Sequence, residues 1–336
     1  MIALSALCLS STFAVRADAQ EVNLYSAQKE HLIKPLLQRF TDKTGIKVRL
    51  ITGDASGLVT RLEHEGEHSP ADLLFTTDIG NIYEAKSKKL LQPIDSKVLN
   101  ENIPPAVRDP QGTWYGFTKR ARIMFMRKQD KANAPKTYDD IAKPQWKGAV
   151  LARSSEDVYN QSLMAFMIYH HGEAKALAWA KGIVANLAHT PVGGDRDQLR
   201  HLAAGEGRIA IANSYYYAML FGADPALHDE QVASKVIPVF LDQETTGVHI
   251  NIRGGGVTRH AKHKKEAIAL LEYLSSEEAQ RIFADANNEY PVHPKVAPSD
   301  VIRGWGDNIK LDAAPLEEIG KLRRRAIILL DEAGWR

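Results

Sequence analysis

The sequence predicts an α/β protein with two lobes, and three observations support this fold class. Residues 21–51 read as a strand, an amphipathic helix and a second strand, and strands joined in this way pair in parallel. Short β-rich runs and helical patterns continue to alternate along the chain. At 336 residues the chain is too long for one ordinary core, so we expect two lobes of roughly 100–200 residues each.

The elements of the first half follow from periodicity and from helix-breaking residues. Pro35 fits the first helix only if that helix begins just before it, because an interior proline removes a backbone hydrogen bond. Gly45 is expected to end this helix. The expected elements are strands at 21–26, 47–51, 71–76, 113–118 and 120–126, and helices at 32–40, 58–65 and 79–88.

The second half has the same character. Ser154 and Ser155 are N-cap candidates for a helix that continues to Met167. Three consecutive glycines at 254–256 are expected to form a structural loop, because they lack the spacing of a nucleotide-binding loop. The other expected elements are strands at 149–153, 209–213, 236–240 and 247–252, helices at 173–185, 195–204, 214–220, 264–274 and 276–285, and a C-terminal helical arm.

Composition and charge argue against a nucleic-acid-binding protein. An apolar content of 44% and a charged content of 25% are typical of a globular protein in water. The net charge is +2 and the positive residues are scattered, so we expect no nucleic-acid partner.

The first 19 residues have the pattern of a secretory signal peptide. An apolar run from Ile2 to Val15 is followed by Ala17-Asp18-Ala19, a small-x-small pattern that predicts cleavage after Ala19 and export to the periplasm. No Lys or Arg precedes the run, which leaves the true start codon open. Because the one cysteine, Cys8, leaves with this segment, the mature chain is expected to lack disulfides, thiolate metal sites and cysteine nucleophiles.

Three consecutive tyrosines form the most informative motif. The apolar run 209–213 leads directly into Tyr215, Tyr216 and Tyr217, which open an amphipathic helix. Successive helical side chains are about 100° apart, so Tyr215 and Tyr216 can converge on one point while Tyr217 turns toward packing. The tyrosines either fill a core or bind a hard cation such as Fe(III), whose charge would allow a phenol to ionise at neutral pH.

Two arginines are candidates for binding an anion. Arg120 and Arg122 are two residues apart in an expected strand and therefore share one face. They are either ordinary surface arginines or a fork for an oxyanion. Ser155, at the start of the helix that carries Tyr159, could contribute as well, because helix N-termini bind anions.

A second motif matches the zinc-protease pattern H-E-x-x-H. Here His64, Glu65 and His68 are interrupted by Gly66 and followed by Pro70. The pattern requires both imidazoles on one face of a continuous helix, and we expect these helix-breaking residues to prevent that.

The chain as a whole resembles the periplasmic ferric-ion-binding proteins that serve ABC importers, a branch of the type II periplasmic binding proteins with a transferrin-like closure. The similarity covers essentially the whole mature chain, and the tandem tyrosines after Asn213 together with Tyr159-Asn160-Gln161 are its most specific motifs. The other motifs that carry it are Asn23-Leu24-Tyr25-Ser26, Thr44-Gly45-Ile46-Lys47-Val48, Ser69-Pro70-Ala71-Asp72 and Glu289-Tyr290-Pro291-Val292.

The resemblance implies a fold and a partner. It implies two α/β lobes joined by hinge strands near residues 117–119 and 247–251, with a central cleft between them. Lobe one would comprise residues 20–118 and 247–296, and lobe two residues 119–246 and 297–336. The protein would be a monomer that passes ferric iron, bare or chelated, to an ABC permease, and it would not be an enzyme.

The resemblance also implies a ligand set. Tyr159, Tyr215 and Tyr216 match the tyrosines that hold Fe(III) in this family, and a synergistic (bi)carbonate would be clamped by Arg120 or Arg122, between which the sequence does not choose. The chain departs from the family at Lys29, where relatives carry a histidine ligand, because a protonated lysine has no lone pair to offer.

Other first-lobe ligands and other functions stay open. His31 and Asp78 are the remaining ligand candidates in that lobe, and we expect the second lobe to dominate binding. The alternatives are a metal-free binder of an anion such as a phosphonate, using Arg120, Arg122 and Ser155, and a secreted zinc hydrolase using His64, Glu65 and His68.

Overall fold

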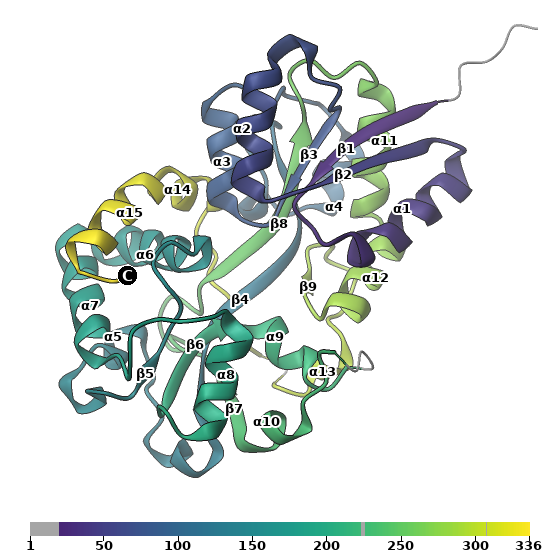
Figure 1. Ribbon diagram of the computed structural model, residues 1–336. Coiled ribbons are helices and arrows are strands. Elements are labelled where there is room, and N and C mark those ends of the chain that lie inside the picture. The colour runs from purple at the N-terminus through teal and green to yellow at the C-terminus, as the bar shows by residue number, and fades with distance from the viewer. Residues whose placement is uncertain (1–19, 223–225, 307) are drawn as a thin grey trace, which may run out of the picture.

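The protein folds into two α/β lobes, one above the other in Figure 1. The computed structural model describes residues 20–222, 226–306 and 308–336, so the predicted signal peptide 1–19 lies outside the described residues. The predicted α/β class and its two-lobed arrangement are confirmed.

Among the described residues, nine strands form a sheet that continues from one lobe into the other. The strand order is β2-β1-β3-β8-β4-β6-β5, with β7 and β9 both paired to β4. The strands are β1 (Glu21–Ser26), β2 (Lys47–Thr52), β3 (Leu73–Thr76), β4 (Tyr115–Arg127), β5 (Val150–Leu151), β6 (Ile209–Asn213), β7 (Val236–Val239), β8 (Ile250–Val257) and β9 (Tyr290–Pro291).

Helices cover the sheet in each lobe (Figure 1). The upper, first lobe carries α1 (Glu30–Thr44), α2 (Ala55–Glu65), α3 (Ile79–Ser87), α4 (Lys97–Asn102), α11 (Lys264–Ser275) and α12 (Glu277–Asn287). The lower, second lobe carries α5 (Tyr138–Ile141), α6 (Val158–His171), α7 (Glu173–Asn186), α8 (Asp195–Ala204), α9 (Ser214–Met219), α10 (Glu230–Lys235) and α13 (Asp300–Arg303).

The β-α-β unit predicted at the start of the chain is present. β1 pairs in parallel with β2, from Glu21 opposite Lys47 to Ser26 opposite Thr52. The prediction that the first helix begins just before Pro35 is wrong, because α1 begins at Glu30 and contains the proline. The apolar residues Ile33, Leu36, Leu37 and Phe40 are buried under the sheet and outweigh the one backbone hydrogen bond that Pro35 cannot make.

Two long strands run side by side between the lobes. The segments predicted as separate strands at 113–118 and 120–126 form one strand, β4, and a shift of register between Gly116 and Thr118 bends it without ending it. β4 pairs with β8 in antiparallel fashion, with Arg120 opposite Asn251, and then continues into the second lobe to pair with β6. The exact lobe limits given by the resemblance stay a prediction.

The three glycines predicted to form a loop instead lie inside β8. None of them has a positive φ angle. A Cβ on Gly255 would lie 2.1 Å from the carbonyl oxygen of Leu74, and one on Gly256 would lie 2.1 Å from that of Thr113. The loop prediction is therefore wrong, and the close approach of neighbouring backbones explains why glycine is needed here.

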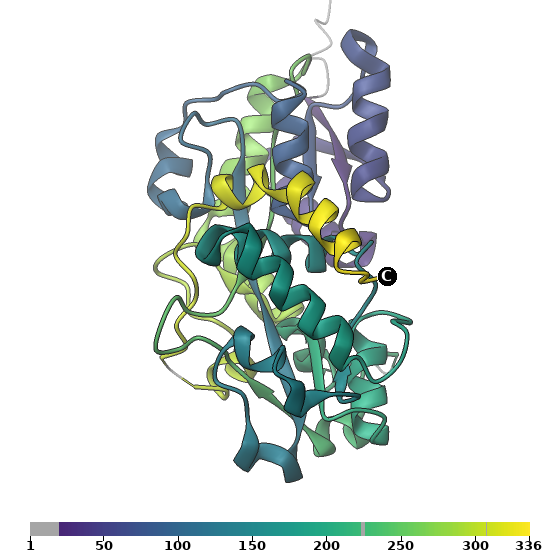
Figure 2. The same cartoon turned by 90° about the vertical axis from the view of Figure 1, so that its left-hand side faces the viewer.

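Two C-terminal helices lie along the boundary between the lobes, drawn in yellow beside α6 in Figure 2. They are α14 (Leu316–Lys321), which packs against α3 and α6, and α15 (Arg323–Glu332), which packs against α6 and α7. Arg323 ties the lobes together, because its guanidinium donates to Glu84 at 2.8 Å and to Gln161 at 3.1 Å.

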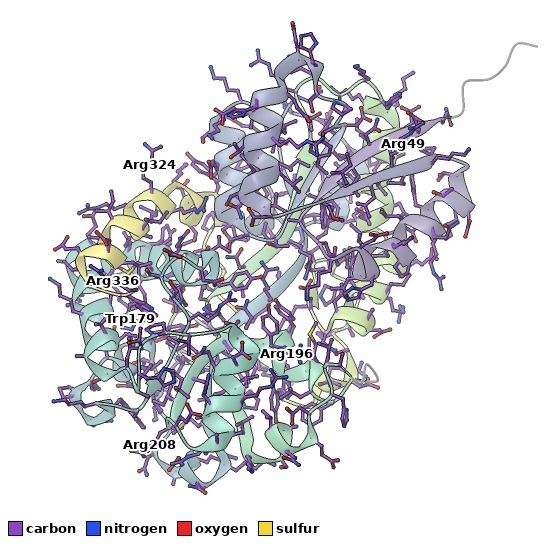
Figure 3. All side chains as sticks on the ribbon, in the orientation of Figure 1. Arg49, Trp179, Arg196, Arg208, Arg324 and Arg336 are labelled. Atoms are coloured by element: carbon purple, nitrogen blue, oxygen red, sulfur yellow. The ribbon has the colours of Figure 1, made fainter. Side chains whose placement is uncertain are left out.

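The charged surface agrees with the scattered pattern read from the sequence. Arg49, Arg196, Arg208 and Arg324 lie in different parts of both lobes (Figure 3). In the part of the chain that the structure describes, no helix is long and apolar enough to cross a lipid bilayer.

Candidate metal centre

The structure brings the three candidate tyrosines together at the boundary between the lobes. Tyr159 is the second residue of α6, and Tyr215 and Tyr216 are the second and third residues of α9. The rings of Tyr215 and Tyr216 lie 4.1 Å apart between centroids and 31° from parallel. Tyr159 is close enough to affect the ionisation of both.

Tyr217 points the other way, as its position in the run predicts. Its ring packs 5.4 Å from Phe125 and 5.1 Å from Phe221, and its hydroxyl donates to the carbonyl oxygen of Val236 at 3.1 Å. Tyr217 is therefore a core residue, and the tyrosine run is divided between the site and the core.

Two of the three phenols line a cavity of about 340 Å³ between the lobes. Tyr159 and Tyr216 face this cavity, while Tyr215 is buried against the Tyr216 ring. The first lobe contributes Ala27, Gly53, Asp54, Ala55, Ser56, Thr77 and Asn81 to the wall, and the remaining wall residues are Arg153, Glu156, Asp157, Val158 and Arg323.

Burial keeps the phenols of Tyr215 and Tyr216 protonated in the metal-free protein. Burial raises the pKa of Tyr215 well above its ordinary value, and the neighbouring phenols Tyr159 and Tyr216 raise it further, against the opposing effect of Arg120. Burial also raises the pKa of Tyr216. A bound cation would reverse this balance, because it stabilises the phenolate form.

Arg120 is a buried cation with unused hydrogen-bond donors. Its side chain is 1% exposed, and none of its three guanidinium nitrogens has a hydrogen-bond partner. Its nearest carboxylate, Glu289, is 3.9 Å away, and its guanidinium lies 5.0 Å from the centre of the Tyr159 ring. Unsatisfied buried donors are costly, so the geometry favours an anion beside Tyr159.

Arg122 is engaged within the protein instead. One of its terminal nitrogens donates to Asp195 at 3.0 Å and to Asn213 at 3.2 Å, and the other donates to Asn160 at 2.7 Å. The structure thus separates the two arginines that share a strand: all three guanidinium nitrogens of Arg120 lack partners, whereas only Nε of Arg122 does.

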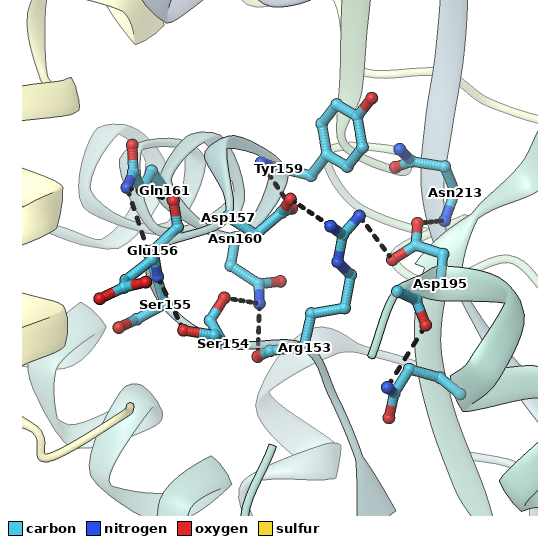
Figure 4. A network of polar contacts seen from close by, with 12 residues as sticks. Arg153, Ser154, Ser155, Glu156, Asp157, Tyr159, Asn160, Gln161, Asp195 and Asn213 are labelled. Atoms are coloured by element: carbon cyan, nitrogen blue, oxygen red, sulfur yellow. Dashed lines mark hydrogen bonds and ion pairs between the residues drawn. The ribbon is translucent and has the colours of Figure 1, made fainter. Parts of the chain in front are cut away.

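Figure 4 shows the polar network beside Tyr159. Arg153 lies between Asp157, at 2.8 Å, and Asp195, at 3.7 Å, and its guanidinium is 5.6 Å from the centre of the Tyr159 ring. Sequence reasoning missed Arg153 and Asp195. The sequence does contain a signal for Arg153, because this residue lies between a strand and the helix that carries Tyr159.

The predicted helix caps near Ser155 are wrong. The N-cap of α6 is Asp157, whose carboxylate accepts from the backbone N–H of Tyr159 at 3.0 Å. The backbone carbonyl of Ser155 accepts from the Gln161 side chain, and Ser155 does not line the cavity (Figure 4). A carboxylate in this position fits the positive end of the helix better than a hydroxyl does.

None of the first-lobe candidates lines the cavity. Lys29 and His31 are exposed at the start of α1 and do not line the cavity. Asp78 is buried and accepts from the Gly80 backbone N–H at 2.6 Å and from Ser162 at 2.9 Å, so it caps α3 and ties it to α6.

The H-E-x-x-H residues form no metal site. The helix α2 ends at Glu65, which accepts from Tyr25 at 2.9 Å and from Arg61 at 2.7 Å, while His64 and His68 are exposed. The zinc-hydrolase alternative fails on this geometry, because Gly66 ends the helix between the two histidines.

Comparison with known proteins places the chain among iron-binding relatives. The family model described as bacterial extracellular solute-binding protein matches residues 36–310. Iron uptake protein A1 of Synechocystis is 40% identical over 321 residues, which cover 95% of this chain and 88% of that protein.

Solved structures agree with the two-lobed fold. A Trichodesmium protein solved in complex with iron and citrate ligands matches with a TM-score of 0.89 at 42% identity, covering 94% of this chain and all of that one. The apo ferric ion-binding protein A of Pasteurella haemolytica matches with a TM-score of 0.87 at 43% identity, covering 94% of this chain and 98% of that one.

Proposed function

Because this chain belongs to the family of bacterial extracellular solute-binding proteins, we propose that it captures ferric iron between its two lobes and delivers it to an ABC permease. In this proposal Tyr159, Tyr215 and Tyr216 bind Fe(III) as phenolates. The proposal draws support from relatives that are named for iron uptake and for ferric iron binding.

The grouping of the three phenols carries the proposal, with Tyr159 and Tyr216 on the cavity wall and Tyr215 packed against the Tyr216 ring. Fe(III) is a hard acid, and three phenolates neutralise its charge. Partial burial of the site strengthens the attraction between phenolate and cation, because the effective dielectric constant is lower there than in bulk water. The proposal includes no carboxylate or imidazole ligand from the first lobe, since His31 is exposed and Asp78 is engaged elsewhere.

A small anion completes the proposed site. The unpartnered donors of Arg120 favour a planar oxyanion such as (bi)carbonate, which accepts bidentate hydrogen bonds and fills positions that the phenols leave open on the metal. A carboxylate such as citrate has the same donor chemistry, and citrate accompanies iron in the Trichodesmium structure.

The remaining parts of the proposal concern the cell. A signal peptide over residues 1–19, cleaved after Ala19, would place the mature protein in the periplasm as a monomer. Iron would then leave the protein at an inner-membrane permease when the lobes separate.

Loading the mature protein with ferric citrate tests this function. Iron bound by tyrosinate should produce a visible charge-transfer band with one iron per chain, and removal of citrate by dialysis against bicarbonate should leave the band in place. A colourless protein that retains no iron would refute the proposal.

A second candidate function rests on Arg120 alone. Its free donors would suit a phosphonate or similar anion without any metal. Titration with ferric citrate separates the two, because an iron carrier would develop the charge-transfer band, whereas a metal-free anion binder would release heat with methylphosphonate and stay colourless with iron.

A further inference from the structure

A second group of metal-binding side chains lies in the second lobe, away from the tyrosines. His189, His201 and Glu206 each offer one ligand atom, and these three atoms lie within 4.8 Å of one another. Within residues 20–222, 226–306 and 308–336, this is the only such group of three or more His, Cys, Asp and Glu side chains.

The chain turns sharply to bring two of these residues together. His201 lies in the last turn of α8, and Gly205 ends that helix with a φ angle of 87°, which L residues rarely adopt. The returning backbone N–H of Glu206 donates to the carbonyl oxygen of His201 at 3.0 Å. The Glu206 carboxylate then lies 2.8 Å from Nδ1 of His201.

Nε2 of His189 directs a free lone pair toward His201 and Glu206. Its Nδ1 lies 2.8 Å from the carbonyl oxygen of Thr190, which can only accept, so Nδ1 carries the proton and Nε2 is unprotonated in the neutral ring. Nε2 is buried and has no hydrogen-bond partner. It lies 3.8 Å from the Glu206 carboxylate, and the two imidazole rings are 5.2 Å apart.

We propose that His189, His201 and Glu206 bind a divalent transition-metal ion, with Zn²⁺ as the representative case. Two imidazoles and one carboxylate form a donor set that suits zinc and leaves one position for water. Ligand atoms around tetrahedral zinc lie about 3.4 Å apart for bonds of about 2.1 Å, so the observed separations require only small side-chain rotations.

Two further features favour a cation here. The site lies at the C-terminal end of α8, where the helix dipole attracts positive charge. The backbone carbonyl of Thr190 orients the His189 ring, which is the arrangement that metal-binding histidines use to fix their tautomer. Glu206 is 48% exposed, so an ion can enter from solvent.

The proposed site differs in chemistry from the tyrosine site. Imidazoles are poor partners for Fe(III) when phenolates are available, and they are good ligands for Zn²⁺. The ion would cross-link the segment after α7 to the end of α8, and a ligand that binds only the folded state raises its melting temperature.

Titration of the metal-free mature protein with zinc chloride tests the proposal. Calorimetry and elemental analysis should give one Zn²⁺ per chain, with a rise in the melting temperature. His201→Asn and His189→Asn should each weaken zinc binding about tenfold or more. His260→Asn removes an exposed histidine outside the group and should leave zinc binding unchanged.

Variants in the two sites separate this proposal from the ferric function. Tyr216→Phe should keep the zinc stoichiometry, and His201→Asn should keep the charge-transfer band with iron and a native circular dichroism spectrum. Absence of zinc binding, or zinc binding that survives both histidine substitutions or disappears in Tyr216→Phe, would overturn the assignment.

Discussion

The phenols of Tyr215 and Tyr216 are neutral groups until a cation reaches them. Burial raises the pKa of both, so metal binding must displace protons from oxygen atoms that hold them firmly. Iron binding should therefore depend on the hydroxyl group of each tyrosine and not on its ring.

Removing a single tyrosine hydroxyl should therefore show whether that tyrosine binds the metal or only packs in the core. Tyr216→Phe keeps the ring contact with Tyr215 and removes one phenolate, so we expect the charge-transfer band to weaken strongly or disappear, with iron affinity reduced at least about a hundredfold. The measurement is visible absorbance during titration with ferric citrate.

Tyr217→Phe is the matched control. It loses the hydrogen bond to Val236 and should cost roughly 0.5–1.5 kcal/mol of stability while leaving the band intact. Equal loss of colour in both variants would contradict the division of the tyrosine run.

The two arginines should respond differently to substitution. Arg120→Gln removes donors that have no protein partner, so we expect a stable protein whose iron affinity falls about tenfold or more as anion binding weakens. Arg122→Gln removes the nearer cation of the buried Asp195 and leaves it only Arg153, at 3.7 Å, so it should cost up to roughly 3–5 kcal/mol of stability.

Chemical denaturation and iron titration of both variants check this contrast. If Arg120→Gln lowers the free energy of unfolding as much as Arg122→Gln does, then Arg120 stabilises the fold and is not an anion-binding residue. The sequence could place both arginines on one strand face, but their roles depend on Asp195 and Glu289, which come from distant segments.

Among the elements, β8 is the one most dependent on residue size. Gly255→Ala would place a methyl group 2.1 Å from the Leu74 carbonyl oxygen, so β3 and β8 would have to separate. We expect a loss of at least about 1–3 kcal/mol, measured by urea unfolding.

Gly57→Ala provides the comparison within a helix. Its Cβ would lie 3.5 Å from the nearest atom, the carboxylate oxygen of Asp54, and alanine favours helix over glycine, so this variant should be stabilised by up to about 1 kcal/mol. Equal stability of the two variants would show that the strand spacing at Gly255 is adjustable.

Most elements could be predicted from periodicity alone, and the errors have specific physical causes. Local signals favoured a late start for α1 and a loop at 254–256, and tertiary packing decided otherwise in both cases. The caps of α6 were wrong because Asp157 competes with two serines that are equally good candidates by residue type. His189, His201 and Glu206 come together because a loop lies beside the end of a helix. Sequence periodicity does not show which loop lies near which helix end.

At the scale of the whole molecule, iron retention should depend on pH in one direction. The pKa values of Tyr215 and Tyr216 are raised in the metal-free protein, so protons compete with iron throughout the range below these values, and affinity falls as pH falls. Each phenol that must lose a proton to bind the metal can add up to about one decade per pH unit to this fall in affinity.

Visible absorbance across an acid titration measures this release. We expect the band to be lost by about pH 4, with recovery on return to neutral pH, since carboxylate chelators compete better as the phenols regain protons. A band that persists unchanged at that pH would count against phenolate ligation.

All three proposed phenol ligands belong to the second lobe, and this has a kinetic consequence. Association should need only an exposed second lobe, whereas dissociation should need the first lobe to move away, so interlobe contacts should control residence time and leave the association rate unchanged. Ser162→Ala removes a 2.9 Å contact with Asp78 and should speed dissociation about fivefold, while Ser234→Ala, at an exposed position of α10, should not. Stopped-flow transfer of iron to a competing chelator measures both rates, and a slower association in Ser162→Ala would mean that capture itself requires both lobes.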